Sequence, residues 1–414
     1  MALEPVRVER EYHEGGPSKG EFLLGDALEL LEPLAARYRG QIKLVYLDPP
    51  FLTGERFSMR VRVGEAGWRA TAGSLRLETF CDHSGLETFL EMMRRVLAAA
   101  RDMLREDGML FLHIDYRTHP HLRLLLDEIF GPENFLNEII WAYQTGGRSL
   151  RYFSRKHDVI LFYRKGPKYD FNVSEVMIAP TAPRANHMRR HVDPDGRVYR
   201  SIRSNGRVYT YYDDDPIAPS DVWTDLGHLQ QRDPERTGYD TQKPLKLLDR
   251  IVRCASREGE WVMDLFAGSG TTLEAARLNG RNFVGVDRCP LTVNLARRRL
   301  EGSEYCLILP PGEGAPRCEA AVEPGVGFYR VTLSAFDPEP GAMPEGVAGM
   351  DAVDNWSVGY LRGDGYHCMA QFARSRREPA LKLELDAPVY AGDLALCVGD
   401  ITGKSFYYRL DPNR

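Results

Sequence analysis

The chain has 414 residues, of which 43% are hydrophobic, and its formal net charge is −5. This length and hydrophobic content exclude a disordered or fibrous chain and predict two domains with buried cores. The small negative charge excludes a surface that attracts nucleic acid as a whole, so any contact with DNA requires a local basic patch.

The seven cysteines are scattered along the chain, and no two of them form a C-x-x-C pair. This spacing argues against a zinc ribbon and a disulfide framework, and it favours the reducing cytoplasm. His119 and His121, with His113 nearby, are a weak metal candidate, because side chains two positions apart on a helix face different ways. We therefore expect no metal site. We also expect no membrane association, because the sequence shows no apolar segment typical of a signal peptide or a membrane span.

The first third of the chain alternates predicted helices with predicted strands. In chain order these are a helix at 27–31 capped by Asp26, a strand at 41–47, a helix at 89–104, a strand at 109–114 after a turn at Asp107-Gly108, and a helix at 119–130. The strands are short and apolar, and 41–47 stops at two prolines, which cannot continue the pairing. This alternation predicts a parallel α/β sheet with helices on both faces.

The composition changes at 145–240, where Arg, Tyr, Gly and Asp replace the long apolar runs. We interpret this segment as an insertion. Inside it, Gly-Arg-Val-Tyr occurs twice, beginning at Gly196 after Asp195 and at Gly206 after Asn205. These two turns introduce short alternating strands, so the sequence predicts a small β platform here.

The α/β pattern then resumes. It predicts a helix at 247–255, a strand at 261–263, a helix from 272 to 278 and a strand at 282–286. Beyond residue 307 a Pro/Gly-rich linker precedes a β-rich appendage that includes 389–393 and 405–410. The predicted domains are a catalytic domain at 20–144 and 241–305, the insertion at 145–240, and a β-rich C-terminal domain at 306–414.

A glycine-rich loop connects the strand at 261–263 to the helix that follows it. Such loops let a ligand approach bare backbone, and they serve dinucleotides, phosphates and adenosyl groups alike. This loop lacks the Lys-Ser/Thr ending of a phosphate-binding loop, and the next strand ends at Asp287, which can accept hydrogen bonds from both hydroxyls of a ribose. A ribosylated cofactor without a triphosphate is therefore favoured over an ordinary tight turn.

The strand at 41–47 runs into the tetrapeptide Asp48, Pro49, Pro50 and Phe51. A carboxylate and the Pro49 carbonyl could each accept one N–H of an exocyclic base amine, which would aim its otherwise delocalised lone pair at a methyl donor. Two prolines fix this geometry in advance, and Phe51 offers a face on which an extruded base can stack. The alternative is a proline-terminated edge strand with a buried Phe.

With these two motifs in this order, the sequence resembles the β-group amino-methyltransferases of DNA. In that family the catalytic motif precedes the target-recognition region and the cofactor motif follows. The resemblance spans about 25–300 and rests on ordered matches at 25–26, 48–51, 107–115, 130–135, 139–141, 221–223, 236–239, 241–244 and 264–272. It implies a Rossmann-like methyltransferase sheet with permuted motif order, an inserted target-recognition region and a C-terminal β-rich appendage.

The resemblance also implies S-adenosylmethionine as cofactor. Loop residues 266–271 would surround its methionine part, 241–244 would close that pocket, Asp287 would bind the ribose, and Asp26 would lie near the adenine. Asp264 would orient the target amine through water. The implied cofactor residues are Asp26, Ala27, Asp48, Thr241, Gln242, Lys243, Pro244, Asp264, Phe266, Ala267, Gly268, Ser269, Gly270, Thr271, Thr272 and Asp287.

In this family Asp at the first position of the tetrapeptide usually accompanies adenine N6, and Ser accompanies cytosine N4, so Asp48 implies adenine. A cytosine-N4 enzyme, an RNA base methyltransferase and a non-enzymatic DNA-binding protein remain alternatives. The long insertion favours double-stranded DNA over RNA. A homodimer and a restriction endonuclease partner are further possibilities that the resemblance raises.

The basic patch that DNA binding requires is predicted in the insertion, where arginines alternate with tyrosines. Its members are Arg148, Arg151, Arg155, Lys156, Arg189, Arg190, Arg197, Arg200 and Arg207. A solvated charged face would have the same composition, so the prediction concerns the cluster rather than any single arginine.

Overall fold

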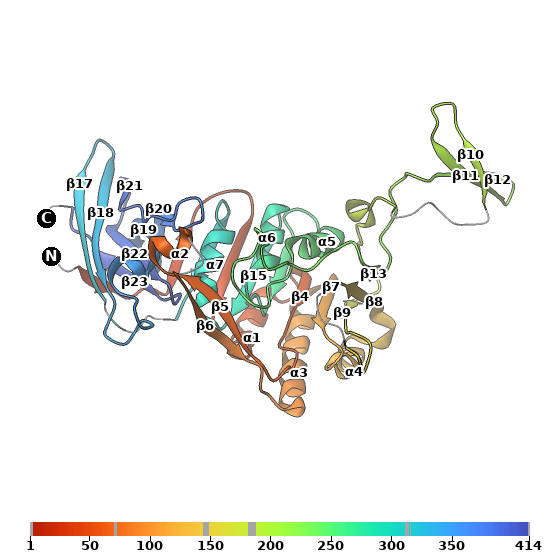
Figure 1. Ribbon diagram of the computed structural model, residues 1–414, viewed down its shortest axis with the longest axis horizontal. Coiled ribbons are helices and arrows are strands. Elements are labelled where there is room, and N and C mark those ends of the chain that lie inside the picture. Colours follow the sequence, from red (N-terminus) through yellow and green to blue (C-terminus); the bar gives the residue numbers. More distant parts are fainter. Residues whose placement is uncertain are drawn as a thin grey trace.

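One mixed sheet of 15 strands runs through the protein (Figure 1). The computed structural model describes residues 3–69, 73–143, 149–180, 188–310, 314 and 316–412. The strand order of the sheet is β1-β23-β22-β19-β20-β2-β16-β3-β15-β14-β4-β7-β9-β8-β13. This order has two parts, a parallel α/β part in the middle and a mainly antiparallel β part formed by both ends of the chain.

The α/β part contains six neighbouring strands that pair in parallel. They are β16 Glu304–Ile308, β3 Lys19–Leu24, β15 Asn282–Asp287, β14 Trp261–Asp264, β4 Ile42–Leu47 and β7 Leu104–Ile114. All six residues of β4 are buried, as expected for a strand covered on both faces. The predicted parallel α/β sheet is confirmed, and the carboxyl ends of these strands meet at one edge.

Helices cover both faces of the α/β part, as predicted (Figure 1). One face carries α1 Ala27–Tyr38, α3 Leu86–Met103 and α4 His119–Phe130, and the other carries α5 Leu245–Ala255, α6 Thr271–Leu278 and α7 Leu291–Arg299. Each set contributes one apolar stripe to its core, which is why the helical spacing was readable in the sequence. Asp26 caps α1 by accepting from Leu28 N–H at 2.8 Å, as predicted.

The remaining strands of this part extend the large sheet beyond β7 or lie apart from it. β9 His157–Arg164 pairs with β7, β8 Phe135–Ala142 pairs with β9, and β13 Val222–Trp223 closes that edge. A hairpin of β5 Arg56–Arg62 and β6 Ser74–Cys81, with the short α2 Gly64–Arg69, follows the tetrapeptide. No feature of the sequence had led us to expect this hairpin.

The predicted turn at Asp107-Gly108 lies inside β7, which runs from Leu104 to Ile114. The backbone folds back there, because a Cβ on Gly108 would lie 2.8 Å from the Arg105 carbonyl oxygen. The pairing of β7 with β4 shifts there, from Ile42 opposite Leu104 to Leu44 opposite Met109, so the extra residues form a bulge. The buried Lys43 ammonium donates to the Asp107 carbonyl and carboxylate, both at 2.9 Å. This contact holds the bulge against the sheet.

The antiparallel β part combines both ends of the chain. The large sheet continues here with two strands from the N-terminal end, β1 Glu4–Val6 and β2 Arg10–His13, and four from the C-terminal end, β19 Val353–Arg362, β20 Gly365–Ala373, β22 Asp393–Asp400 and β23 Ser405–Arg409. A second sheet consists of β17 Arg317–Pro324, β18 Phe328–Asp337 and β21 Glu384–Pro388. The region beyond residue 316 is thus β-rich, as predicted. Of the two stretches named in the sequence, 405–410 contains β23, and 389–392 link β21 to β22, which begins at Asp393.

The insertion carries a separate three-stranded sheet, which we call the arm sheet. It consists of β10 Arg189–Val192, β11 Val198–Ser204 and β12 Arg207–Tyr212, and it projects away from the body at the right of Figure 1. The two predicted turns are confirmed. Asn205 and Gly206 have φ values of 50° and 77°, the left-handed pair of a type I′ hairpin, and Gly196 has a φ of 84°.

Short 3₁₀ helices occur at η2 Pro132–Asn134, η3 Val173–Val176 and η4 Gly349–Ala352. In the described parts of the chain, no helix is both long and apolar enough to cross a lipid bilayer. Nor do three or more His, Cys, Asp or Glu side chains of the described residues gather as metal ligands.

Candidate functional site

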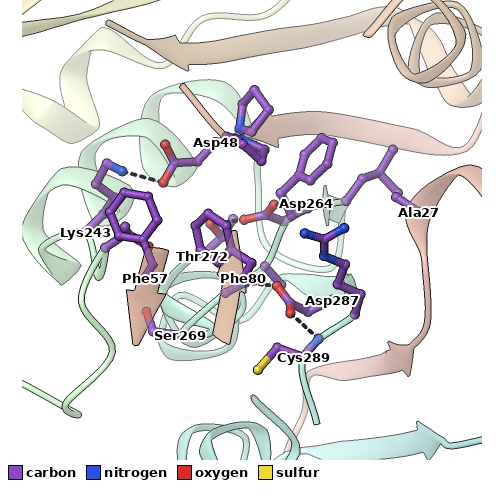
Figure 2. A pocket seen from close by; sticks show the side chains of 18 of the residues that line it. Ala27, Asp48, Phe57, Phe80, Lys243, Asp264, Ser269, Thr272, Asp287 and Cys289 are labelled. Atoms are coloured by element: carbon purple, nitrogen blue, oxygen red, sulfur yellow. Dashed lines mark hydrogen bonds and ion pairs between the residues drawn. The ribbon is translucent and has the colours of Figure 1, made fainter. Parts of the chain in front are cut away.

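A pocket opens at the carboxyl ends of β3, β4, β14 and β15, the edge of an open α/β sheet at which ligands bind. It brings together most of the residues that the sequence singled out. These lining residues are Asp26, Ala27, Asp48, Pro49, Pro50, Phe51, Thr241, Lys243, Asp264, Phe266, Ala267, Gly268, Ser269, Thr271, Thr272 and Asp287. Figure 2 shows Asp48 and Lys243 on one side of the pocket and Asp287 and Cys289 on the other, with Asp264 and Thr272 between them.

The glycine loop forms one wall of the pocket and presents backbone to it. Gly268 has a φ of 50°, and its N–H donates to the Asp287 carboxylate at 2.7 Å. A Cβ on Gly268 would lie 3.4 Å from the Tyr239 ring, which is an ordinary contact, so the positive φ rather than lack of space favours glycine there. Gly270 has a φ of 77° and starts α6 without lining the pocket, which differs from the contact the resemblance implied.

Asp264, at the end of β14, organises the glycine loop from inside. Its carboxylate accepts from Thr272 Oγ1 at 2.6 Å and from Phe266 N–H at 3.0 Å. Burial raises the pKa of Asp264 to about 7, although both hydrogen bonds favour the ionised form. Each of its oxygens thus already accepts one hydrogen bond from the loop, and its suggested action on a target amine through water stays a prediction.

Asp287, at the end of β15, faces the pocket between two backbone donors. Gly268 N–H and Cys289 N–H donate to its two oxygens at 2.7 and 2.8 Å. Burial raises the pKa of Asp287, and these donors oppose that shift. Each carboxylate oxygen has a second lone pair, so Asp287 can still accept from a ligand hydroxyl.

Asp48, at the end of β4, forms the opposite end of the pocket. The Lys243 ammonium is ion-paired with Asp48 Oδ2. Asp48 Oδ1 is buried and has no hydrogen-bond partner among the described residues. A buried acceptor without a donor is costly, so this oxygen is placed to receive a donor from a ligand.

Lys243 connects the Asp48 end of the pocket to the glycine loop. Its ammonium lies 5.2 Å from the centre of the Phe51 ring, and its carbonyl accepts from Thr271 Oγ1 at 3.2 Å. The sequence had suggested Lys243 as a cofactor residue. Its side chain instead contacts the two residues proposed to hold the base.

Two other residues of the 241–244 segment lie outside the pocket lining. The Gln242 side chain accepts from the Thr237 N–H and hydroxyl, both at 2.8 Å, and donates to the Glu235 carbonyl at 2.9 Å. Pro244 immediately precedes α5 as its N-cap residue. In this structure both support the segment that carries Thr241 and Lys243.

A buried polar network under Phe51 was missed from the sequence. His113 is fully buried, and its ring nitrogens bond Tyr46 Oη at 2.8 Å and Asp158 Oδ2 at 3.1 Å. The His113 ring is stacked against Phe51 at 6.0 Å and lies edge-on to Trp141. A single histidine inside the apolar strand 109–114 was the available signal, but it was expected to be a packing or surface residue.

The β5–β6 hairpin adds aromatic walls to the pocket, and nothing in the sequence had indicated them. Phe57 and Phe80 are stacked at 4.8 Å and both line the pocket (Figure 2). Asp82 fixes the chain after the tetrapeptide by accepting from Thr53 N–H at 2.8 Å. Phe57 and Phe51 are 6 residues apart in the sequence, and the intervening loop brings both to the same pocket.

The predicted basic patch is divided by the structure. Arg148 lies outside the described residues. Arg197 is ion-paired with Asp214 and Asp215, which raises its pKa, and Arg200 is ion-paired with Asp213. Arg155 stacks on Tyr116, and Lys156 is half-buried. The exposed arginines Arg151, Arg189, Arg190 and Arg207 make no ion pair with a described residue.

Comparison with known proteins matches residues 42–298 to the sequence model of the DNA methylase family. The chain is 29% identical to the type II methyltransferase M.EcaI of Enterobacter cloacae, over 62% of this chain and 64% of that protein. It is 24% identical to the DNA adenine methyltransferase YhdJ of Escherichia coli K12, over 68% and 82% of the two chains. It is also 24% identical to the EcoPI Mod subunit of an Escherichia phage, over 69% and 60%.

Among solved structures, a putative DNA modification methylase of Thermus thermophilus, complexed with S-adenosyl-L-methionine, covers 72% of this chain and all of its own, with 20% identity and a TM-score of 0.41. The cytosine-N4-specific PvuII DNA methyltransferase gives 14% identity and a TM-score of 0.44, over 70% and 87% of the two chains. The match at 42–298 includes both motifs of the pocket. The chain therefore belongs to the N6/N4 DNA methylase family.

Proposed function

We propose that the protein transfers a methyl group from S-adenosylmethionine to the N6 amine of an adenine turned out of duplex DNA. The observation that carries this proposal is the Asp48 carboxylate, which has one oxygen held by Lys243 and the other buried without a partner in the pocket. Membership of the DNA methylase family supplies the class of acceptor.

The other end of the pocket fits the cofactor. Asp287 offers a carboxylate to ribose hydroxyls, Gly268 offers backbone that no side chain shields, and Asp26 and Ala27 lie at the start of α1 on the same wall. Phe266 and Thr271 also line the pocket. When bound, S-adenosylmethionine supplies an electrophilic methyl group.

The Asp48 end makes the base amine a better nucleophile. One N–H donates to Asp48 Oδ1 and the other to the Pro49 carbonyl, which draws the nitrogen lone pair out of conjugation with the ring. One face of Phe51 stacks on the base, and the His113 ring stacks against Phe51 and keeps it in place. The amine becomes acidic only after methylation, so proton loss can follow transfer and Asp48 need not be a strong base.

Adenine is the proposed base because residue 48 is Asp. In addition, one relative, which this chain matches over 82% of that protein's length, is named a DNA adenine methyltransferase. The same acceptors would serve the N4 amine of cytosine, which remains the alternative. The insertion at 145–240 is proposed as the target-recognition region, between the two parts of the catalytic domain, 20–144 and 241–305. The C-terminal domain at 306–414 completes the proposed organisation.

Double-stranded DNA is the proposed partner, in keeping with the cytoplasmic location expected from the cysteines. Restriction endonuclease partners are suggested by relatives that are Mod subunits of type III restriction-modification enzymes. Those relatives are longer, and the matched part spans 60% and 50% of them, so assembly with an endonuclease is part of the proposal. A homodimer is also proposed on the family resemblance.

The test is incubation of the purified protein with methyl-labelled cofactor and unmethylated genomic DNA, followed by nucleoside analysis. We expect label in N6-methyladenine with the wild type and none with Asp48→Ala, which removes the acceptor. Label in N4-methylcytosine would contradict the adenine assignment. Label in neither nucleoside, or full activity of Asp48→Ala, would contradict the proposed chemistry.

A further inference from the structure

The segment 149–156 between β8 and β9 leaves the sheet at the catalytic edge. Ala142 at the end of β8 pairs with His157 at the start of β9, and Val159 pairs with Ile114, the last residue of β7. The loop therefore emerges beside the strand end that carries His113.

The polar network ties the base of this loop to the pocket. Asp158, two residues beyond the loop, accepts from His113 at 3.1 Å and from Tyr143 Oη at 2.8 Å. His113 in turn stacks against Phe51. The loop is thus connected through two side chains to the ring on which we propose that the base stacks.

Leu150 and Phe153 are the two most exposed large apolar side chains of this loop, at 102% and 99%. Isolated exposed apolar residues are common, but a leucine and a phenylalanine held entirely in solvent on one short loop beside an active site are unusual. They form what we call the apolar tip.

The loop has a defined conformation that presents this tip. Ser149 Oγ accepts from Arg151 N–H at 3.2 Å and from Tyr152 N–H at 3.3 Å, and Ser154 Oγ accepts from Ser149 N–H at 3.3 Å. These side-chain to backbone hydrogen bonds of the two serines form a turn. The apolar tip is therefore held outward by the turn.

Arginine and aromatic side chains flank the apolar tip. The Arg155 guanidinium lies 3.9 Å from the Tyr116 ring centre and 5.1 Å from that of Tyr152, and it donates to Tyr116 Oη at 2.6 Å. Arg151 is exposed beside the tip. Apolar side chains flanked by positive charge fit DNA, in which phosphates border the stacked bases. They fit an apolar groove on a protein less well, because such a groove offers no negative charge.

We propose that Phe153, with Leu150 beside it, enters the DNA stack at the position that the target base leaves. This inference rests on the proposed function, because a base must leave the duplex to reach Asp48. The vacated position exposes the faces of the two neighbouring bases, and an aromatic ring inserted there restores stacking. Arg151 and Arg155 would contact the adjoining phosphates.

The test compares Phe153→Ala with the wild type on two duplexes that carry the methylation site, mapped beforehand in DNA modified by the wild type. One duplex is fully paired, and the other has an abasic site opposite the target base, which lowers the cost of extrusion. Stacking of about 1–3 kcal/mol per base corresponds to about a fivefold to 150-fold loss of kcat/KM on the paired duplex. On the abasic duplex we expect most of this loss to disappear.

Leu124→Ala is the matched control, since Leu124 is 70% exposed on α4 and takes no part in the proposed contact. We expect it to equal the wild type on both duplexes. Phe153→Trp keeps an aromatic ring and should retain activity. Equal losses for Phe153→Ala on the two duplexes, or no loss on the paired one, would overturn the inference. A wild type that methylates neither base would overturn the proposed function, and the inference with it.

Discussion

The pocket and the arm sheet use charged side chains in opposite ways. At the pocket, Asp48, Asp264 and Asp287 lie at the ends of strands that are buried on both faces, and named donors hold most of their oxygens. In the arm sheet, none of the residues at 189–212 is fully buried. The pocket is thus preorganised by the core behind it, whereas the arm sheet has no core of its own and offers both faces to solvent.

The arm sheet shows that the number of arginines in a segment can overstate its positive surface charge. Residues 189–215 contain six arginines but also five aspartates. Arg197 and Arg200 are ion-paired with three of those aspartates. The positive surface of the arm sheet is therefore smaller than its composition indicates, and the pocket is the better-defined half of the function.

Besides the changes at Asp48, Lys243→Met is the pocket substitution expected to lower kcat most. Without the ammonium, the Asp48 carboxylate is free to turn away from the base. A misplacement of about 1 Å in an active site costs about a hundredfold in kcat. Cofactor affinity should change little, because the Lys243 side chain contacts Asp48 and Phe51. Single-turnover rates and cofactor titrations of the same preparations measure both quantities.

Lys243→Arg is the conservative control. It keeps a positive charge beside Asp48, so it should retain part of the single-turnover rate that Lys243→Met loses. If Lys243→Met lost cofactor affinity while its single-turnover rate stayed normal, Lys243 would be a cofactor residue, as the sequence had suggested.

The next effect concerns stability, through Asp264. Its pKa is raised by burial to about 7, from an ordinary 3.8. Between about pH 4 and 7 the folded protein binds the proton more tightly than the unfolded chain does. The resulting stabilisation is complete at low pH and is lost as the pH rises through 7. Over this window the contribution of Asp264 to the free energy of unfolding falls by about 4 kcal/mol.

Asp264→Asn removes this titration and can still accept from Phe266 N–H. As the pH rises from 4 to 8, we expect the unfolding free energy of the wild type to fall relative to that of the variant. Urea unfolding at a series of pH values measures it. A difference that stays constant with pH would show that Asp264 is not protonated in the folded protein near neutrality.

The smallest effects belong to the arm sheet. Arg190→Ala and Arg207→Ala each remove an exposed arginine without a described ion pair, and each should weaken DNA binding several-fold. Each should also lower the slope of log K against log salt by about one. Arg197→Ala is the matched control, because its guanidinium is occupied by Asp214 and Asp215. Equal effects of all three changes would mean that the ion pairs do not decide which arginines reach DNA.

The sequence predicted the pocket well because its signals are local. Strand 41–47, the tetrapeptide after it, the glycine loop and Asp287 all sit at strand ends, and parallel pairing brings such ends together. Helix 119–130 and the Asn205-Gly206 turn were likewise encoded by neighbouring residues.

What the sequence did not predict depends on partners far along the chain. Lys243 reaches Asp48 across 195 positions, and Asp107 is held in a bulge by Lys43, 64 positions away. His113 acquires its role only when β9 places Asp158 beside it. Periodicity and turn chemistry describe single elements, and they contain no information about which polar side chains meet across the sheet.

The division of the pocket into a cofactor end and a base end is tested most directly by calorimetric titration of S-adenosylmethionine into wild type, Asp48→Ala and Asp287→Ala. We expect Asp48→Ala to bind within about threefold of wild type. Asp287→Ala should bind about a hundredfold more weakly, because it loses hydrogen bonds between a carboxylate and the ribose. Equal weakening by both changes, or undiminished binding by Asp287→Ala, would contradict the division.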